Sequence, residues 1–471
     1  MHRSKTLGGI ALASLMLVAL TGCPSIIANI VGATESVQQA INSASAGDTI
    51  KILGSHTENV TISKDGITLT SETGGSIDGD VTVDGNNVTI SNLTITGKLD
   101  TVPGSFNNLT LDNVAVQGWN NATINGTFTC DKIIQPGNSV QTAIDNSTAG
   151  QSICIASDTY AENIAIDKSL TLAGMGNPTL NSSANQVIDV EADEVTISGF
   201  VLTNPDHGYG IIAHDHSDVT ITDNTLKNIG SNTSFKDKAK GIYVKANGTP
   251  ISDIVIINND FDQIGSLDGN GSNAVFVGDS TGTSTISNVE IKNNKMTNLF
   301  ARTTPWGGGS SLTGGHGAYG ILVNHGSSGG GSVTGLIISG NTIDNAEGLW
   351  SRGIGLEGPT PNAIVKGNDI SNIIDHKSPS DGVGVHFEQN PNADTVTVEK
   401  NNFTGIIGWG VAQHAALLAS HDLTVDARNN YWGAADGPSG GSGPQENTSA
   451  TGSGVSVSKD VLFNPYANSP F

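Results

Sequence analysis

The chain of 471 residues has few charged and few aromatic side chains. Charged residues make up 14% of the sequence and aromatic residues 5%, whereas about a quarter of the residues of an average globular protein are charged. Lys and Arg together number 21 against 44 Asp and Glu, which gives a formal net charge of −23. Nucleic acid is bound mainly through Lys and Arg contacts to its phosphates. We therefore expect no nucleic-acid partner.

Glycine is abundant instead, with 60 residues, and 36% of the chain is hydrophobic. Both glycine and β-branched residues disfavour helices. The glycines follow no three-residue period, which excludes a collagen-like chain. The hydrophobic fraction is too high for a disordered protein. The composition therefore favours an all-β fold.

The N-terminus has the features of a targeting segment. Arg3 and Lys5 precede a short apolar run over 7–20, which ends in Leu-Thr-Gly-Cys23. This ending resembles the lipobox of bacterial lipoproteins, which implies that 1–22 is a signal peptide, that Cys23 carries the lipid, and that 23–33 is an anchor or linker. A plain secretory signal peptide is the alternative. The other two cysteines, Cys130 and Cys154, would pair in an oxidising compartment or stay as buried thiols.

Short repeats dominate the rest of the chain. Segments such as Val219-Thr-Ile-Thr-Asp-Asn224 and Val289-Glu-Ile-Lys-Asn-Asn294 alternate apolar and polar residues and end in Asn. The alternation is typical of a half-buried strand. Two further short strands follow each Asn, so each repeat predicts one coil of a parallel β-helix. The stacked Asn side chains are expected to form a hydrogen-bonded ladder along one corner, as amide ladders do.

Two segments predict covers for the ends of such a helix. Residues 36–52 read as a short amphipathic helix, a turn and a strand, and 139–155 repeat the same pattern. An open sheet edge needs a cover because it templates aggregation. We therefore expect a small N-terminal β-helix module over 34–128 and a main β-helix over 136–471.

Three motifs carry a family resemblance. The segments that begin at Glu58-Asn-Val-Thr-Ile and Tyr160-Ala-Glu-Asn-Ile look like the opening coils of pectin-lyase-like proteins. Asn429-Asn-Tyr-Trp-Gly, followed by Gly-Pro438, resembles the terminal motif of secreted β-helix proteins. The resemblance implies an all-β, right-handed parallel β-helix with short capping helices. Because this superfamily holds lyases, hydrolases, esterases, epimerases, adhesins and surface-layer components, the fold implies no single function.

The third strand of each coil and the loops that precede it form the expected ligand edge. Alternation places Lys245, Asn324, Glu357 and His386 in one outward column, with Glu357 and His386 on adjacent coils. Loops on one edge of a rigid scaffold often bind ligands. The expected binding residues are those with side chains suited to sugars or uronates, namely Arg302, Trp306, Tyr319, Asn324, Trp350, Arg352, Asp381 and Trp409. A merely solvated face is the alternative.

A shorter match concerns Tyr209-Gly-Ile-Ile-Ala-His-Asp215. It resembles a motif of mannuronan C-5 epimerases, which implies catalytic roles for Tyr209 and His214. The Asp and Pro of that motif are replaced here by Ile212 and Ala213. Together with His386, Glu357 and Lys245, these two residues complete the set of catalytic candidates. No metal site is predicted, although Asp78, Asp80 and Asp84 leave Ca²⁺ open.

These features predict a cell-surface β-helix lipoprotein in the cell envelope, extracellular or periplasmic, which binds carbohydrate or has a structural or adhesive role. The alternative is a polysaccharide-modifying enzyme, a lyase, hydrolase or C-5 epimerase, that acts on an acidic glycan. The expected partner is a polysaccharide or envelope glycan. Contact with the membrane is expected through the lipid anchor only.

The lipobox generates the first testable prediction. Mass spectrometry of the membrane-bound protein should show that the chain starts at Cys23 and carries a diacylglyceryl group there. An unmodified N-terminus upstream of Cys23 would contradict this prediction.

Overall fold

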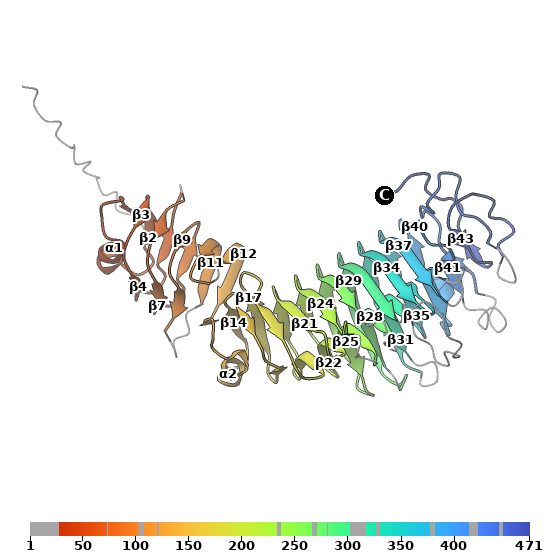
Figure 1. Ribbon diagram of the computed structural model, residues 1–471, viewed down its shortest axis with the longest axis horizontal. Helices are drawn as coiled ribbons and strands as arrows, with labels where there is room; N and C mark the ends of the chain where they lie inside the picture. Colours follow the sequence, from red (N-terminus) through yellow and green to blue (C-terminus); the bar gives the residue numbers. More distant parts are fainter. Residues whose placement is uncertain are drawn as a thin grey trace, which may run out of the picture.

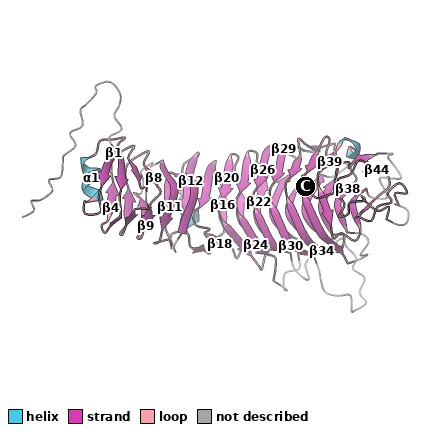
Figure 2. Ribbon diagram, turned by 90° about the horizontal axis from the view of Figure 1, so that it is seen from above, coloured by secondary structure: helices cyan, strands magenta, loops and turns pink. Residues whose placement is uncertain are grey.

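The computed structural model describes residues 28–72, 74–102, 108–119, 122–232, 237–265, 271–279, 281–301, 317–325, 330–376, 382–413, 423–441 and 446–471. Short parallel strands are stacked coil upon coil along one axis (Figures 1 and 2). The predicted all-β parallel β-helix is thereby confirmed, and its right-handedness stays a prediction. No helix in the described ranges is long and apolar enough to cross a membrane.

The N-terminal coils contain two sheets. The strands of the larger sheet are, in spatial order, β1 (Ala28–Val31), β2 (Thr49–Ile52), β5 (Thr68–Thr70), β8 (Thr89–Ser91), β11 (Leu109–Val116), β9 (Thr94–Ile95), β6 (Ser76–Ile77) and β3 (Ser55–His56), and β12 (Ala122–Cys130) pairs with β11. The smaller sheet consists of β10 (Leu99–Thr101), β7 (Val81–Val83) and β4 (Val60–Ile62). Neighbouring coils pair in parallel, whereas β11 and β12 are antiparallel.

The coils from residue 132 onward form three long sheets, which we call sheets C, D and E. Sheet C consists of β13 (Lys132–Ile134), β14 (Gln151–Ile155), β17 (Leu170–Gly174), β20 (Val195–Ser198), β23 (Val219–Thr222), β26 (Ile251–Ile257), β29 (Thr285–Lys292), β33 (Ile337–Ser339), β36 (Ile364–Lys366), β39 (Thr397–Glu399), β42 (Val425–Asp426) and β44 (Val461–Leu462), with β32 (Ser332–Thr334) paired to β29.

Sheet D consists of β15 (Thr159–Tyr160), β18 (Thr179–Asn181), β21 (Val201–Asn204), β24 (Thr225–Ile229), β27 (Asp260–Ile264), β30 (Lys295–Ala301), β34 (Thr342–Gly348), β37 (Asp369–Asp375) and β40 (Asn402–Thr404). Sheet E consists of β16 (Ile164–Ile166), β19 (Gln186–Val190), β22 (Tyr209–His214), β25 (Ala239–Ala246), β28 (Ser272–Asp279), β31 (Ala318–His325), β35 (Arg352–Glu357), β38 (Val383–Glu388), β41 (Trp409–Gln413) and β43 (Ser456–Val457). A short 3₁₀ helix, η2 (Ala393–Thr395), precedes β39.

The core is built from columns of identical or similar residues on successive coils. In sheet C, Ile197, Ile221, Ile256 and Ile291 pair in register, and each has a fully buried side chain. Because side chains alternate between the two faces of a strand, the polar residues between them face outward. Burial of each such side chain contributes about 1.5–3 kcal/mol, and the regular repeat multiplies this contribution.

The expected asparagine ladder runs along the corner between sheets C and D. The side-chain amide of each Asn donates to the Oδ1 atom of the Asn on the next coil, at N···O distances of 2.9–3.1 Å. The members, each 0–1% exposed, are Asn224, Asn259, Asn294, Asn341, Asn368, Asn401 and Asn430. The last member comes from the terminal motif that begins at Asn429, so this motif continues the ladder.

Each ladder residue follows a residue in the left-handed backbone region. At Asp223, Asn258 and Asn293 the φ angles are 56°, 56° and 54°. Asn, Asp and Gly tolerate this conformation best, which explains the Asp-Asn, Asn-Asn and Gly-Asn pairs in the repeats. The turn aims the ladder side chain inward, where its second N–H donates to a carbonyl such as that of Ile256.

Two short helices cover the starts of the coils in the same way, as expected. Helix α1 (Val37–Ser43) is capped by Ser36, and α2 (Val140–Asp145) by Ser139. In α2, both Ser139 and the first backbone N–H groups donate to the carboxylate of Glu162 at 2.8–3.0 Å. Glu58 accepts the equivalent bonds at α1. Negative charge at a helix N-terminus is favourable.

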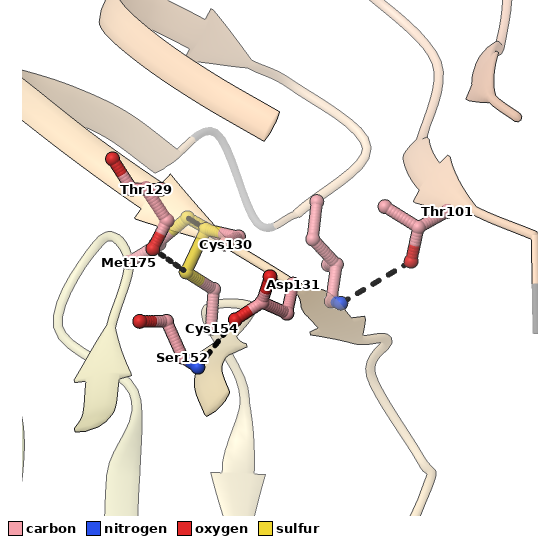
Figure 3. The surroundings of a disulfide bond; sticks show 8 residues. Thr101, Thr129, Cys130, Asp131, Ser152, Cys154 and Met175 are labelled. Atoms are coloured by element: carbon pink, nitrogen blue, oxygen red, sulfur yellow. Dashed lines mark hydrogen bonds between the residues drawn. A yellow bond between two sulfur atoms is a disulfide. The ribbon is translucent and has the colours of Figure 1, made fainter. Parts of the chain in front are cut away.

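The junction near residue 130 is tied by several contacts. Cys130 at the end of β12 and Cys154 in β14 form a disulfide with a Cα–Cα distance of 5.6 Å (Figure 3). Beside it, the backbone N–H of Ser152 donates to Asp131 (Figure 3). Cys154 points away from the main core and packs with the N-terminal core instead. The division into modules at 34–128 and 136–471 stays a prediction.

The ladder can be tested by Asn294→Ala. This substitution should lower the free energy of unfolding by about 1–3 kcal/mol, because the buried partners on both neighbouring coils lose hydrogen bonds. Chemical denaturation measures the effect. Asn247→Ala, at an exposed asparagine outside the ladder, is the control and should stay within about 0.5 kcal/mol of the parent. Equal denaturation midpoints for Asn294→Ala and Asn247→Ala would contradict the prediction.

Candidate functional site

Three rows of side chains lie on the outer face of sheet E, set by the strand register. The first row precedes the glycine or alanine at the start of each strand and consists of Tyr209, Lys240, Asn273, Tyr319, Arg352, Val383 and Trp409. The second row is Ile212, Tyr243, Phe276, Leu322, Gly355, His386 and Ala412. The third row is His214, Lys245, Gly278, Asn324, Glu357 and Glu388.

The expected adjacency of Glu357 and His386 in one column is wrong. The structure pairs Arg352 with Val383, so that Glu357 pairs with Glu388 and His386 pairs with Gly355 in the second row. The repeat pattern matches Gly353 with Gly382, whereas in the structure Gly384 occupies the place equivalent to Gly353. His386 is only 4% exposed. The acidic neighbour of Glu357 is therefore Glu388, which sequence reasoning missed.

A cleft of about 410 Å³ crosses the middle of these rows, between β25 and β38. It is lined by Lys238, Lys240, Gly271, Ser272, Asn273, Phe276, Gly317, Tyr319, Leu322, Asn324, Trp350, Arg352, Glu357 and Glu388. Five of the expected site residues are among them, namely Tyr319, Asn324, Trp350, Arg352 and Glu357. The expected Tyr209, His214, Lys245, His386 and Trp409 do not line the cleft.

Some expected residues lie outside the part of the chain that the structure describes. They are Arg302, Trp306 and Asp381 of the binding set and the lipidation site Cys23. Trp409, although described, packs against the C-terminal segment, since a Cβ on Gly441 would lie 2.4 Å from its ring.

Glu357 is the most strongly perturbed carboxyl group in the cleft. The Tyr319 hydroxyl donates to its Oε1 at 3.2 Å, and the Asn324 amide donates to its Oε2 at 2.5 Å. Burial and the neighbouring Glu388 raise the pKa of Glu357 to about 7, against the opposing effect of these donors and of Arg352. Glu357 thus holds a proton over much of the acidic pH range and can donate it to a ligand.

Glycine at position 355 makes room for this arrangement. A Cβ there would lie 3.0 Å from the ring of Tyr319 and 3.1 Å from Leu322. The tyrosine ring therefore lies across Gly355 and brings its hydroxyl to Glu357. Burial and Glu357 together raise the pKa of Tyr319, so its hydroxyl stays a donor.

Arg352 is held by the protein rather than presented as a free surface cation. The residue is 5% exposed, and its Nη1 lies 3.7 Å from Asp375 Oδ2. The same Nη1 donates to the Ser351 carbonyl at 2.8 Å. Asp375 also accepts from the backbone N–H of Trp350, whose φ angle is 65°. The ion pair fixes the loop that carries Trp350 at the rim of the cleft.

Aromatic rings surround Lys240 at the β25 end of the cleft. Its Nζ lies 4.0 Å from the ring centroid of Tyr243, 5.2 Å from that of Tyr209 and 5.1 Å from that of Phe276. The Tyr209 and Tyr243 rings are stacked at 5.7 Å. Burial, assisted by the charge of Lys238, lowers the pKa of Lys240 to about 8. Lys240 was not among the expected site residues.

The two residues of the epimerase-like motif lie beside this aromatic cluster. His214 packs edge-on against Tyr243 at 5.2 Å, and burial together with Lys245 lowers its pKa. Within the described residues, no group of three His, Cys, Asp or Glu is placed to hold a metal ion.

Comparison with known proteins yields one related sequence and several matches among solved structures. No family model matches the chain. A segment is 37% identical over 93 residues to a cell surface glycoprotein of Methanothermus fervidus, which is 19% of this chain and 15% of that protein. The chain thus spans a small part of this relative.

Among solved structures, sacteLam55A from Streptomyces sp. SirexAA-E covers 88% of this chain, and 91% of its own length is matched, at 10% identity with a TM-score of 0.28. A mutant of the PL6 family alginate lyase AlyGC covers 85% of this chain, with 81% of its own length matched, at 11% identity with a TM-score of 0.23. The Family 28 exopolygalacturonase of Yersinia enterocolitica covers 81%, with 79% matched, at 12% identity with a TM-score of 0.14.

The raised pKa of Glu357 predicts a pH-dependent stability. Between pH 4.5 and 7 the folded state keeps a proton that the unfolded state loses, so stability falls as the pH rises through this window. Glu357→Gln, which carries no charge, should match the parent at pH 4.5. At pH 8 it should be more stable than the parent by about 3 kcal/mol. Urea denaturation at both pH values measures this. A difference in the free energy of unfolding between the two proteins that is the same at both pH values would contradict the prediction.

Proposed function

We propose that the protein is a cell-surface protein that binds a glycan chain in the cleft on the outer face of sheet E. The observation that carries the proposal is the lining of the cleft, which combines the rings of Phe276 and Tyr319 with the amides of Asn273 and Asn324. Aromatic faces pack on the apolar faces of sugars, and amides and carboxylates bond their hydroxyl groups. The segment shared with a cell surface glycoprotein supports a surface location.

The dimensions of the cleft suit a polymer rather than a single sugar. The lining extends from Lys240 in β25 to Glu388 in β38, which are four coils apart. Coils stack at about 4.8 Å, so this distance is roughly 19 Å along the axis. A chain of several sugar units would lie along the stack. We further propose that the lipid at Cys23 attaches this binding surface to the cell envelope.

Hydrolysis of the bound glycan is a second candidate, favoured by the Glu357 and Glu388 pair. A pair of neighbouring carboxyl groups is the arrangement of glycoside hydrolases, and the raised pKa of Glu357 suits it to act as the acid. Glu357 would donate its proton to the glycosidic oxygen as the C–O bond breaks, while the carboxylate of Glu388, one coil away, would attack the anomeric carbon. Water would then cleave this glycosyl ester and return a proton to Glu357. Elimination and C-5 epimerisation are less well supported, because Tyr209 and His214 do not line the cleft.

Glycan binding is tested on an array of envelope and plant polysaccharides, followed by titration of the best ligand. Phe276→Ala should weaken binding about five- to tenfold, because a lost aromatic contact is worth on the order of 1 kcal/mol. Val255→Ala, which shortens a half-buried side chain on the outer face of sheet C, is the matched control and should bind like the parent. Absence of binding to every glycan would overturn the proposed function.

Hydrolysis is tested separately on the glycan that binds. Reducing ends should appear with the parent, and Glu357→Gln should abolish their release while binding persists. Release that is unchanged in this variant would exclude Glu357 as the acid. Binding without any release by the parent would leave glycan binding as the function.

A further inference from the structure

Lys240 is a buried cation for which the described residues supply no carboxylate partner. The residue is 7% exposed and lines the cleft. Its ammonium makes contacts with three aromatic rings, and no hydrogen bond or ion pair to it is found within the described ranges. By contrast, Arg352 is neutralised by Asp375. Of the two buried cations of the cleft, Arg352 thus has an ion-pair partner, and Lys240 has none among the described residues.

Such an arrangement is costly unless a ligand completes it. An unpaired charge away from water is unfavourable, and contacts with aromatic faces replace only part of its lost hydration, because they supply no hydrogen-bond acceptor to the ammonium. The acidic residues that line the cleft lie far away, since Glu357 is three coils from Lys240, or about 14 Å along the axis. Asp237 is near enough to raise the pKa of Lys240 in part, but it makes no ion pair with the ammonium and does not line the cleft. The cleft is therefore cationic at its β25 end and acidic at its β35–β38 end.

We propose that the β25 end of the cleft is a subsite for a negatively charged group of the glycan, with Lys240 as the cation that binds it. This inference rests on the proposed glycan-binding function and adds the class of ligand, a sugar that carries a carboxylate or a sulfate. Lys238, which lines the same end, adds positive charge at the mouth. The aromatic rings hold the ammonium in place, and Phe276, the one of the three that lines the cleft, packs on the sugar that carries the anion.

The proposal includes a dependence on pH. The titratable groups around Lys240 are Lys238 and Asp237 on the preceding segment, Tyr209 and His214 on β22, and Tyr243 and Lys245 on its own strand. Burial lowers the pKa of Lys240 to about 8, so its ammonium loses its charge as the pH rises from 7 to 9. Glu357 in the same cleft ionises near pH 7, so the dependence is measured in Glu357→Gln, where affinity for an anionic glycan should fall only as the pH rises above about 8.

The test compares polymers that differ only in charge. The full chain is titrated with polygalacturonate and its carboxyl-reduced form, and with a sulfated galactan and its desulfated form. The parent should bind at least one anionic polymer tenfold or more tightly than its neutral counterpart at pH 7. The pair that shows the preference identifies the anion. Lys240→Met, which keeps an unbranched side chain between the rings, should remove this preference while leaving affinity for the neutral polymer.

Two controls separate recognition from a structural role. Lys227→Met removes the same charge from an exposed position on sheet D and should keep the preference. Lys240→Met should unfold at the same temperature as the parent or higher, because it removes a buried unpaired charge. Retention of the preference in Lys240→Met, or equal binding of charged and neutral polymers by the parent, would overturn the inference while glycan binding stands. Failure of the parent to bind any glycan would overturn both.

Discussion

The asparagine ladder is the constraint on which the functional face depends. Each rung satisfies both amide N–H groups and the carbonyl of a side chain buried at the corner between sheets C and D. A slip of one coil by a single residue would leave these groups without partners, at a cost of about 1–3 kcal/mol for each. The ladder therefore fixes the register of successive coils. That register in turn decides which side chains share a row on sheet E.

Loops of different length can be inserted between sheets D and E because the ladder holds the other corner. Steps between ladder residues range from 27 to 47 residues, yet the strands on either side pair without interruption. The chain uses this freedom to bring Trp350 and Lys238 to the cleft from loops, while the strands supply Tyr319, Glu357 and Glu388. A rigid scaffold with variable loops is a common way to build a binding site.

The fold could be predicted from the sequence because its signal is repeated. The alternation of apolar and polar residues, the Asn that ends each repeat and the duplicated caps all indicate the same architecture. A prediction is sound when strand pattern, turn residues and end caps agree in this way. The site was predicted only in part. Which side chains lie side by side in it depends on how the strands of neighbouring coils pair, and the repeat pattern alone does not specify this pairing. Gly353-Ile-Gly-Leu resembles Gly382-Val-Gly-Val closely, and this similarity hid a shift of two residues. The shift placed His386 where Glu388 lies.

Lys240 could have been found from the sequence by another route. It directly precedes Gly241, just as Tyr209, Tyr319 and Arg352 precede the first glycines of their strands. At these glycines an added Cβ would meet a core side chain, such as that of Phe261 at Gly241. The glycine must therefore face the core, so the preceding residue faces outward and begins a row. Tyr319, Arg352 and Trp409, which the sequence suggests one by one as binding residues, thus belong to a single row. The same row contains Lys240, so it includes both buried cations of the cleft.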